Sequence, residues 1–491
     1  MQGNIVRRIR AFAALKQVGP LAVALGGTLL MCAPAYAESL QQALANAYLV
    51  NPTLNAERAA LRSSDENLPI AKSNLRPQIL GNASKSYINQ NSDGPTGVGT
   101  GISDGTGTGV DFTTFSTDGV TRPFSMGVTL SQTIFAGFQN VNAIRQAKSG
   151  IQAAREALRY AEQQVLLQAT IAYVDVVRDE AVIRLRENNV NVLTEQLKQT
   201  RDRFDVGEVT RTDVAQAEAR RADALSTLSV AQANLKSSRA TYEQIVGHPP
   251  RSLAKPTSIM HLLPRTLSQA QTLGDGENPQ ILNAVYLEEA SLYVVNQITG
   301  ELLPQVSLEA GYQKDYGLSD RLDEQEATTV TGRVTVPLYQ GGGVAARIRQ
   351  AKEDNHRLKK LVEEARLAVH ADVISSWGVL QSTAATIRSA ESAVRANKIA
   401  LAGVREEAQV GQRTTLDVLN AQLEYLESQI NLVTALRDRV VAEYSLYAAI
   451  GRMDAQTLAL NVPYYDPFEH YDTVKNKWFG LRPPSPPLAD E

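Results

Sequence analysis

An internal duplication restricts the fold of this chain more than any other feature of its sequence. The run Ile144–Lys148 recurs as Ile348–Lys352, an offset of 204 residues. The same offset relates Val206-Gly207 to Val410-Gly411, Asp213-Val214 to Asp417-Val418, and Ile245-Val246-Gly247 to Ala449-Ile450-Gly451. Nearer the N-terminus, Asn51-Pro52 matches Asn278-Pro279 at an offset of 227. Because one register persists over about a hundred residues, the chain holds two copies of one structural unit.

Both copies have the same order of elements: a helical segment, a β-hairpin, and a long helical hairpin that turns at the Val-Gly pair. The first copy is predicted to span 38–247, with its β-hairpin at 76–136 and its helical hairpin at 140–247. The second is predicted to span 265–451, with the corresponding hairpins at 303–340 and 344–451. A Pro-containing linker, 248–264, joins them, and 452–491 is a C-terminal extension. The change of offset places an insertion in the first β-hairpin, where the Gly-rich tract 94–109 is predicted to be a mobile loop.

The second strand of each β-hairpin alternates apolar and polar residues. The apolar positions are Phe124, Met126, Val128 and Leu130 in one copy, and Val330, Val334, Val336 and Leu338 in the other. This period of two predicts an apolar face turned either to lipid in a membrane barrel or to the core of a soluble sandwich. Four strands cannot close a barrel, since the smallest single-chain barrels use about eight. A barrel would therefore need several chains, and three copies would supply twelve strands.

The helical hairpins make a similar demand. Residues 140–206 and 344–409 contain no Pro and almost no Gly, and they are rich in Ala, Gln, Glu, Arg and Leu. This composition is typical of long helices, and some 65 residues at 1.5 Å each span roughly 100 Å. A freestanding coiled-coil rod would explain the helices but leave the β-hairpins without a purpose. The predicted fold class is therefore α+β, mostly α, with duplicated helical hairpins and β-hairpins.

The N-terminus is typical of an export signal. Four basic residues precede an apolar stretch, and Ala35-Tyr36-Ala37 supplies the small residues of a cleavage site, so 1–37 is predicted to be removed. Without it the 52 acidic residues outnumber 45 basic ones, which disfavours nucleic-acid binding. The single cysteine, Cys32, would leave with the signal. No later apolar run is long enough for a membrane-spanning helix, so entry into a bilayer would require a β-barrel.

These features together resemble the TolC family of outer-membrane efflux and secretion channels, in an alphaproteobacterial-like form with a C-terminal extension. The resemblance covers Glu38 to about Leu460 and is most specific at the two helical turns, Arg203–Gly207 with Thr212–Val214, and Val410–Thr414 with Leu416–Ala421. It implies a homotrimer with a twelve-stranded barrel in the outer membrane of a Gram-negative bacterium. A tunnel of twelve helices would cross the periplasm and meet an adaptor protein and an inner-membrane pump of RND or ABC type.

The resemblance also implies roles at the far tips of the helices. Asp417 falls on an acidic ring that constricts the pore, and Asn420 stands at its second, usually acidic position. Thr212, Asp213 and Arg413 fall on links that hold the tip closed, and the tyrosine that completes the link in well-known members is here Ala408. Asn420 and Ala408 therefore predict a weaker or differently built closure.

The residues at the tips also have simpler interpretations. Thr210-x-x-Asp213 and Thr414-x-x-Asp417 are capping boxes at helix starts. The glycines of the two turns supply the left-handed conformation that ends a helix. Because the turns are exposed, we interpret them as an edge for docking the adaptor, formed by Val206, Gly207, Glu208, Val410, Gly411 and Gln412.

Nothing in the sequence indicates catalysis. The five histidines form no metal-binding motif, and no nucleophile, phosphate loop or cofactor site stands out. Gly341-Gly342-Gly343 is interpreted as a strand-to-helix elbow. The aromatic residues of the tail, 464–479, are predicted to pack on the outside of the helices at their waist, with a disordered Pro-rich end. The leading hypothesis is a channel subunit that serves efflux or type I secretion, and the alternative is a periplasmic coiled-coil adaptor.

Overall fold

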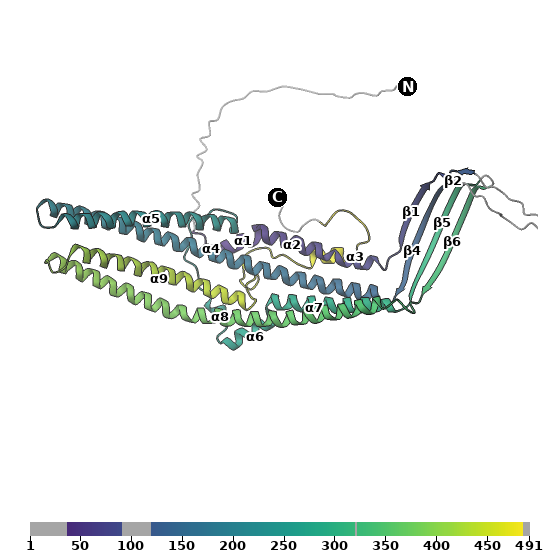
Figure 1. The fold of residues 1–491 in the computed structure, drawn as a ribbon. Helices are drawn as coiled ribbons and strands as arrows, with labels where there is room; N and C mark the ends of the chain where they lie inside the picture. Colours follow the sequence, from purple (N-terminus) through teal and green to yellow (C-terminus); the bar gives the residue numbers. More distant parts are fainter. Residues whose placement is uncertain (1–36, 91–118, 320–321, 485–491) are drawn as a thin grey trace, which may run out of the picture.

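The computed structural model describes residues 37–90, 119–319 and 322–484. Most of the signal segment, the Gly-rich tract 94–109 and the end of the Pro-rich tail lie outside these residues. The molecule is a long rod of helices with a β-sheet at one end (Figure 1). The helices are α1 (Leu40–Val50), α2 (Pro52–Asp65), α3 (Asn67–Ser73), α4 (Gln139–Asp205), α5 (Arg211–Val246), α6 (Leu267–Glu277), α7 (Pro279–Thr299), α8 (Gly343–Gln409), α9 (Thr415–Ala449) and α10 (Glu469–Val474), with 3₁₀ turns η1 (Met260–Leu262) and η2 (Gly300–Leu302).

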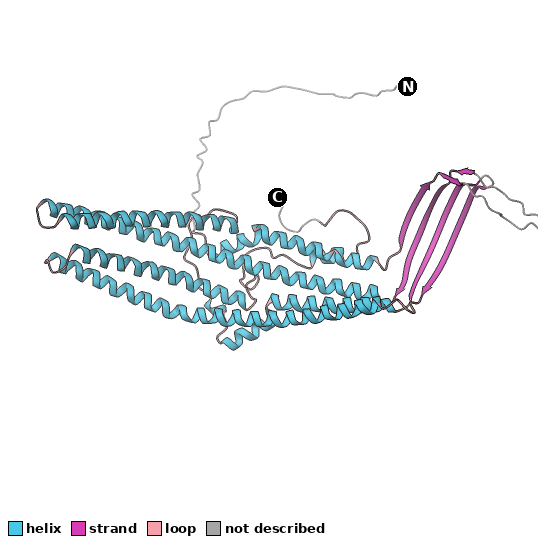
Figure 2. Cartoon of the chain, viewed as in Figure 1, coloured by secondary structure: helices cyan, strands magenta, loops and turns pink. Residues whose placement is uncertain are grey.

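Two continuous helices, α4 and α8, set the length of the rod. Each has 67 residues, which corresponds to about 100 Å. Shorter helices cover them in two tiers (Figures 1 and 2): α1, α2, α3 and α7 near the sheet, and α5 and α9 toward the far tips. None of the described helices is both long and apolar enough to cross a bilayer.

The main hydrophobic core lies where the two tiers meet. Tyr173 of α4 and Tyr242 of α5 are completely buried there, with ring centroids 6.4 Å apart. The hydroxyl of Tyr173 lies 2.7 Å from the carbonyl oxygens of both Glu38 and Ala254. The first described residues and the segment between the two copies are thereby held at the middle of the rod.

The strands are β1 (Gln78–Lys85), β2 (Ile88–Gln90), β3 (Gly119–Thr121), β4 (Phe124–Ala136), β5 (Gln305–Ser319) and β6 (Leu322–Thr335). The four long ones form one antiparallel sheet in the order β1-β4-β5-β6, while β2 pairs with β3. The two copies therefore meet along β4 and β5, and β1 and β6 are the edges of the sheet.

The structure adds detail to two parts of the predicted order and contradicts one predicted strand end. The first helical segment is three helices, because Asn51 caps a new helix that starts with Pro52. The helix α6 was not predicted; it follows the linker, which itself contains the turn η1. The predicted strand that includes Val336 and Leu338 ends at Thr335, because Pro337 has no N–H to donate and restricts the residue before it.

Two sharp elbows connect strands to the long helices. Gly137 and Phe138 between β4 and α4 have positive φ, and so have Gly341 and Gly342 between β6 and α8, as the elbow interpretation predicts. At the first elbow the backbone approaches another segment closely. A Cβ on Gly137 would lie 2.1 Å from the carbonyl oxygen of Gly300, and a Cβ on Gly300 would lie 2.2 Å from that of Gly137. The junction of α7 and η2 thus fits only against a glycine elbow.

We predict that Gly300→Ala destabilises the protein, whereas Gly150→Ala in α4 does not. Gly300 has a φ of −62°, which alanine accepts, so the cost arises from overlap with Gly137 and amounts to about 1–3 kcal/mol for overpacking. A Cβ on Gly150 meets nothing within 4 Å, and alanine is favoured over glycine in a helix by about 1 kcal/mol. Thermal unfolding in detergent, followed by circular dichroism, measures both; equal melting temperatures for Gly300→Ala and the unchanged protein would contradict the prediction.

Candidate functional site

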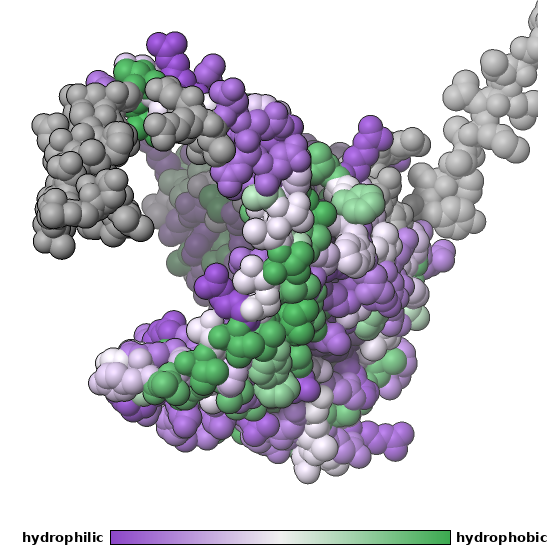
Figure 3. Space-filling view, turned by 90° about the vertical axis from the view of Figure 1, so that its right-hand side faces the viewer, coloured by the Kyte–Doolittle hydropathy of each residue, from purple (hydrophilic) through white to green (hydrophobic). Residues whose placement is uncertain are grey.

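The sheet has one apolar and one polar face. In register across the strands lie Ile79, Leu130, Ala310 and Val330 on one face, and Gln78, Ser131, Glu309 and Thr331 on the other. The apolar face is uncovered within the described chain: the side chains of Val128 and Val330 are 49% and 72% exposed. Hydrophobic residues form a continuous band at this end of the molecule (Figure 3). A sandwich core needs a second layer over this face, and the helices do not supply one, so the soluble-sandwich alternative is not supported.

The edges of the sheet are as informative as its faces. Strand β1 pairs only with β4, and β6 only with β5, among the described strands. Each edge therefore presents a row of unpaired backbone groups, which favours pairing with another chain.

The helical tips lie at the opposite end of the rod from the sheet (Figure 1). Val206 and Val410 are 72% and 71% exposed, and the glycines that follow them have φ values of +80° and +79°. A Cβ on Gly207 or Gly411 would meet nothing within 4 Å. The two turns are thus closely similar, sharply bent and accessible.

Both tip carboxylates act as helix caps. Asp417 Oδ2 accepts hydrogen bonds from Thr414 N (3.0 Å) and Thr414 Oγ1 (2.9 Å). Asp213 accepts the equivalent bonds from Thr210 at 2.9 and 2.7 Å. In each case these hydrogen bonds lower the pKa of the carboxyl, so both are ionised at neutral pH.

The residues assigned to gate links do not meet within one chain. Arg413 pairs with Glu407 at 2.8 Å on its own hairpin, and Asp213 bonds to Thr210. Thr212 is exposed. Asn420 has a partner that the sequence did not indicate: Arg220 of α5 donates to its side-chain oxygen at 2.8 Å. The position that the resemblance places on a pore ring thus joins the two hairpins of one chain.

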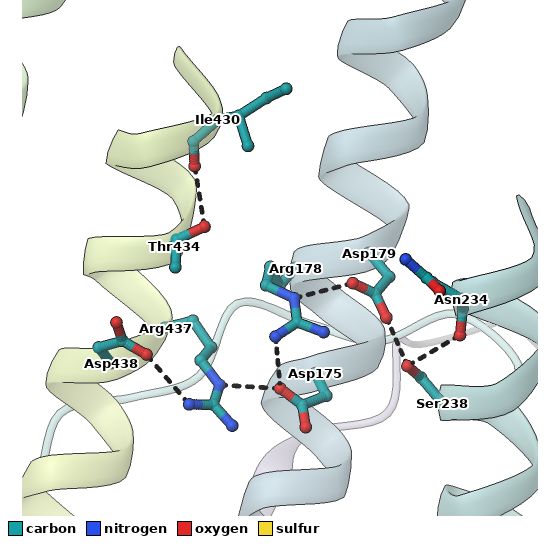
Figure 4. Close-up of polar contacts among 9 residues, drawn as sticks. All are labelled: Asp175, Arg178, Asp179, Asn234, Ser238, Ile430, Thr434, Arg437 and Asp438. Atoms are coloured by element: carbon teal, nitrogen blue, oxygen red, sulfur yellow. Dashed lines mark hydrogen bonds and ion pairs between the residues drawn. The ribbon is translucent and has the colours of Figure 1, made fainter. Parts of the chain in front are cut away.

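A polar network farther from the tips also joins the hairpins (Figure 4). Arg437 of α9 donates to Asp175 of α4 at 2.8 Å, and Arg178 lies 3.1 Å from the same oxygen. Arg178 in turn bonds to Asp179 at 2.8 Å, and Ser238 of α5 donates to Asp179. This set of residues ties α9 to both helices of the other hairpin.

A comparison of the two copies could have identified this network. The residues of the second copy that correspond to Asp175 and Asp179 are Val379 and Thr383, and the first-copy counterpart of Arg437 is Ala233. Charges present in only one copy have no role in the shared architecture of the two units. The pair of Asp175 and Arg437 marks a contact between the copies, whereas Asp179 bonds within the first copy, to Arg178 and Ser238.

Comparisons with known proteins agree with this arrangement. Residues 40–248 and 275–452 match the outer membrane efflux protein family. The chain is 40% identical over 478 residues to the outer membrane efflux protein BepC of Brucella suis, covering 97% of this chain and 99% of that protein. It is 25% identical over 446 residues to the outer membrane protein TolC of Escherichia coli, covering 87% and 85% of the two chains.

Solved structures share the fold. The Campylobacter jejuni CmeC outer membrane channel superimposes with a TM-score of 0.72 at 16% identity, covering 89% of both chains. The outer membrane protein VceC of Vibrio cholerae does so with a TM-score of 0.68 at 19% identity, covering 84% of this chain and 96% of that one. The family is one of channels and not of enzymes, and its members are channels of the Gram-negative outer membrane that extend into the periplasm. The chain described here belongs to the outer membrane efflux protein family, to which TolC and its relatives are assigned.

Proposed function

We propose that three copies of this chain form a passive exit channel, with twelve strands in the outer membrane and twelve helices in the periplasm. The observation that carries the proposal is the four-stranded sheet with an exposed apolar face and two open edges. Lipid can accept the apolar face, but it cannot satisfy the backbone groups of β1 and β6. Pairing of β6 with β1 of the next chain removes both edges, and three chains close a ring of ordinary barrel size.

The partners follow from the length of the helices and from the relatives. A rod of about 100 Å reaches far beyond a bilayer, so its tips are available to a periplasmic adaptor and an inner-membrane pump of RND or ABC type. The relatives include the alkaline protease secretion protein AprF of Pseudomonas aeruginosa, 27% identical over 323 residues, as well as BepC. We therefore assign the chain to a tripartite efflux or type I secretion system. A role as the adaptor itself gives the apolar sheet face no purpose.

The direct test is conductance. Purified protein is expected to run as a heat-sensitive trimer on a gel and to open ion-conducting channels in planar lipid bilayers. Open channels show that the assembled rod encloses a continuous water path. Trimers that insert into the bilayer yet conduct no current would overturn the assignment of a channel.

We further propose that Asp417 forms a ring of ionised carboxylates around the three-fold axis, where it binds divalent cations and blocks current. Asp417→Asn is expected to reduce the block by Mg²⁺ at least several-fold, since asparagine keeps the helix cap but not the charge. Asp372→Asn is the control, because it removes one exposed carboxylate from α8 about 55 Å from the tip and should leave the block in place. Single-channel recordings at increasing Mg²⁺ concentration compare the block in the two variants. An undiminished block in Asp417→Asn would refute the ring.

The exposed turns are proposed as the adaptor-docking edge, formed by Val206, Gly207, Glu208, Val410, Gly411 and Gln412. Gly207→Ala combined with Gly411→Ala is expected to lower antimicrobial resistance in a host that depends on this channel. Alanine disfavours the positive φ of both turns by about 1–2 kcal/mol each, which changes their shape without altering the trimer. Gly403→Ala, within α8, is the control. Full resistance in a double variant that assembles normally would count against docking at the turns.

A further inference from the structure

The C-terminal segment after α9 runs back toward the sheet instead of ending at the waist of the rod. It follows α1, α2 and α3 in order, through bonds of Tyr465 N to Tyr48 Oη (2.9 Å), His470 Nδ1 to Asp65 Oδ2 (3.1 Å), Lys72 Nζ to Lys475 O (2.6 Å) and Arg76 Nη1 to Lys477 O (2.8 Å). Tyr465 is partly buried, as the sequence predicts for a packed aromatic residue, but Tyr464 and Phe468 are exposed, and Trp478 and Phe479 lie beyond the waist.

The segment ends in an exposed apolar cluster beside the first residue of the sheet. The ring of Trp478 lies over the guanidinium group of Arg76 at 4.6 Å, and Arg76 is two residues before β1. Trp478, Phe479 and Leu481 are 64%, 90% and 103% exposed. Gly480, with a φ of +125°, turns the chain between the last two. Three large apolar side chains exposed together on such a short segment indicate a surface that is covered by lipid or by another protein.

Basic side chains surround this cluster. Lys72, Arg76, Lys148, Lys475, Lys477 and Arg482 lie on it or in the adjoining parts of α3 and α4. Of these, Lys475 has a carboxylate partner, Asp472 at 2.8 Å, while the described residues place no carboxylate within ion-pair distance of the others. Burial lowers the pKa of Lys72, and the charges of Lys148, Arg76 and Lys475 lower it further. The positive charge here is therefore concentrated and poorly compensated.

We propose that Trp478, Phe479 and Leu481 insert into the periplasmic leaflet of the outer membrane and that the surrounding basic residues bind its anionic phospholipid head groups. Tryptophan beside lysine and arginine is the composition that membrane interfaces favour. The position of the cluster fits as well. If the sheet is inserted in the bilayer, the first residue of β1 lies at the periplasmic surface of the membrane, and the cluster lies beside it. The inference rests on the proposed function, because the barrel sets the cluster at the height of the membrane surface. The family assignment places the protein in the outer membrane.

A neighbouring copy of the chain is the other possible cover for this cluster. A protein surface would exclude lipid from Trp478 as well as water, whereas insertion excludes water and admits lipid. The two differ in one measurable property, the contact of the indole ring with acyl chains.

The sequence offers a clean probe, because Trp377 and Trp478 are its only tryptophans. Trp377→Phe leaves Trp478 as the sole emitter in trimers reconstituted into vesicles that contain phosphatidylglycerol. Brominated lipids are expected to quench its emission, which also shifts to shorter wavelength, as for an indole at the membrane interface. The control is Trp478→Phe, whose Trp377 lies in α8 about 50 Å from the elbow and should not be quenched.

Two results would overturn the proposal. Emission at long wavelength with quenching by aqueous iodide would leave Trp478 in water, and emission at short wavelength without quenching by bromolipid would place it against another subunit. Conductance of the same trimers is recorded in parallel, so a failed insertion is distinguishable from a failed channel.

A charge variant tests the head-group contact. Lys148→Gln combined with Arg482→Gln removes two exposed charges and leaves the apolar cluster intact. In this variant the quenching of Trp478 in phosphatidylglycerol vesicles is expected to fall toward the value in phosphatidylcholine vesicles. Equal quenching of the unchanged protein in the two lipids would show that anionic head groups are not bound.

Discussion

The unpaired backbone N–H and C=O groups at the free edges of β1 and β6 are the constraint that the rest of the structure must satisfy. A backbone N–H or C=O without a partner costs several kcal/mol in lipid, and each of the two edge strands presents a row of such groups. Identical chains can pair these edges with one another, because each chain supplies one β1 edge and one β6 edge. Since short elbows at Gly137 and Gly341 connect the strands directly to α4 and α8, the proposed ring of strands would also arrange the long helices around the same axis.

The two copies share an architecture but not a charge pattern, and the difference assigns them unequal roles. Asp175 and Asp179 hold α9 through Arg437 and α5 through Ser238, whereas the second copy has Val379 and Thr383 in their place. The hairpin of α8 and α9 is thus joined to the other hairpin mainly through α9. Nearer the tip, the hydrogen bond from Arg220 to Asn420 also joins the two hairpins. An aspartate at this position would make the same bond stronger, because both partners would be charged.

Much of the fold follows from the sequence because its signals are local or repeated. The period of two in β4 and the absence of Pro from α4 act within one element, and the repeat register relates each element to its counterpart. Contacts that depend on tertiary placement were missed. The pairing of Arg220 with Asn420 joins residues 200 positions apart, and the early end of β6 reflects Pro337 overriding a good apolar pattern. At the tips, Asp213 and Asp417 were correctly identified as caps, but the Glu407 partner of Arg413 was not foreseen.

The contact of His470 with Asp65 has a consequence for the order of folding. Both side chains are nearly completely buried, although they are 405 positions apart, and one approaches from the last helix of the chain. The surface that receives α10 is made by α2 and α4, so it exists only after these helices have packed. The C-terminal segment can therefore reach its place only after α2 and α4 have packed, and until it does the Asp65 carboxyl lacks its His470 partner. The His470–Asp65 pair thus joins the two ends of the described chain only once the helices between them have packed.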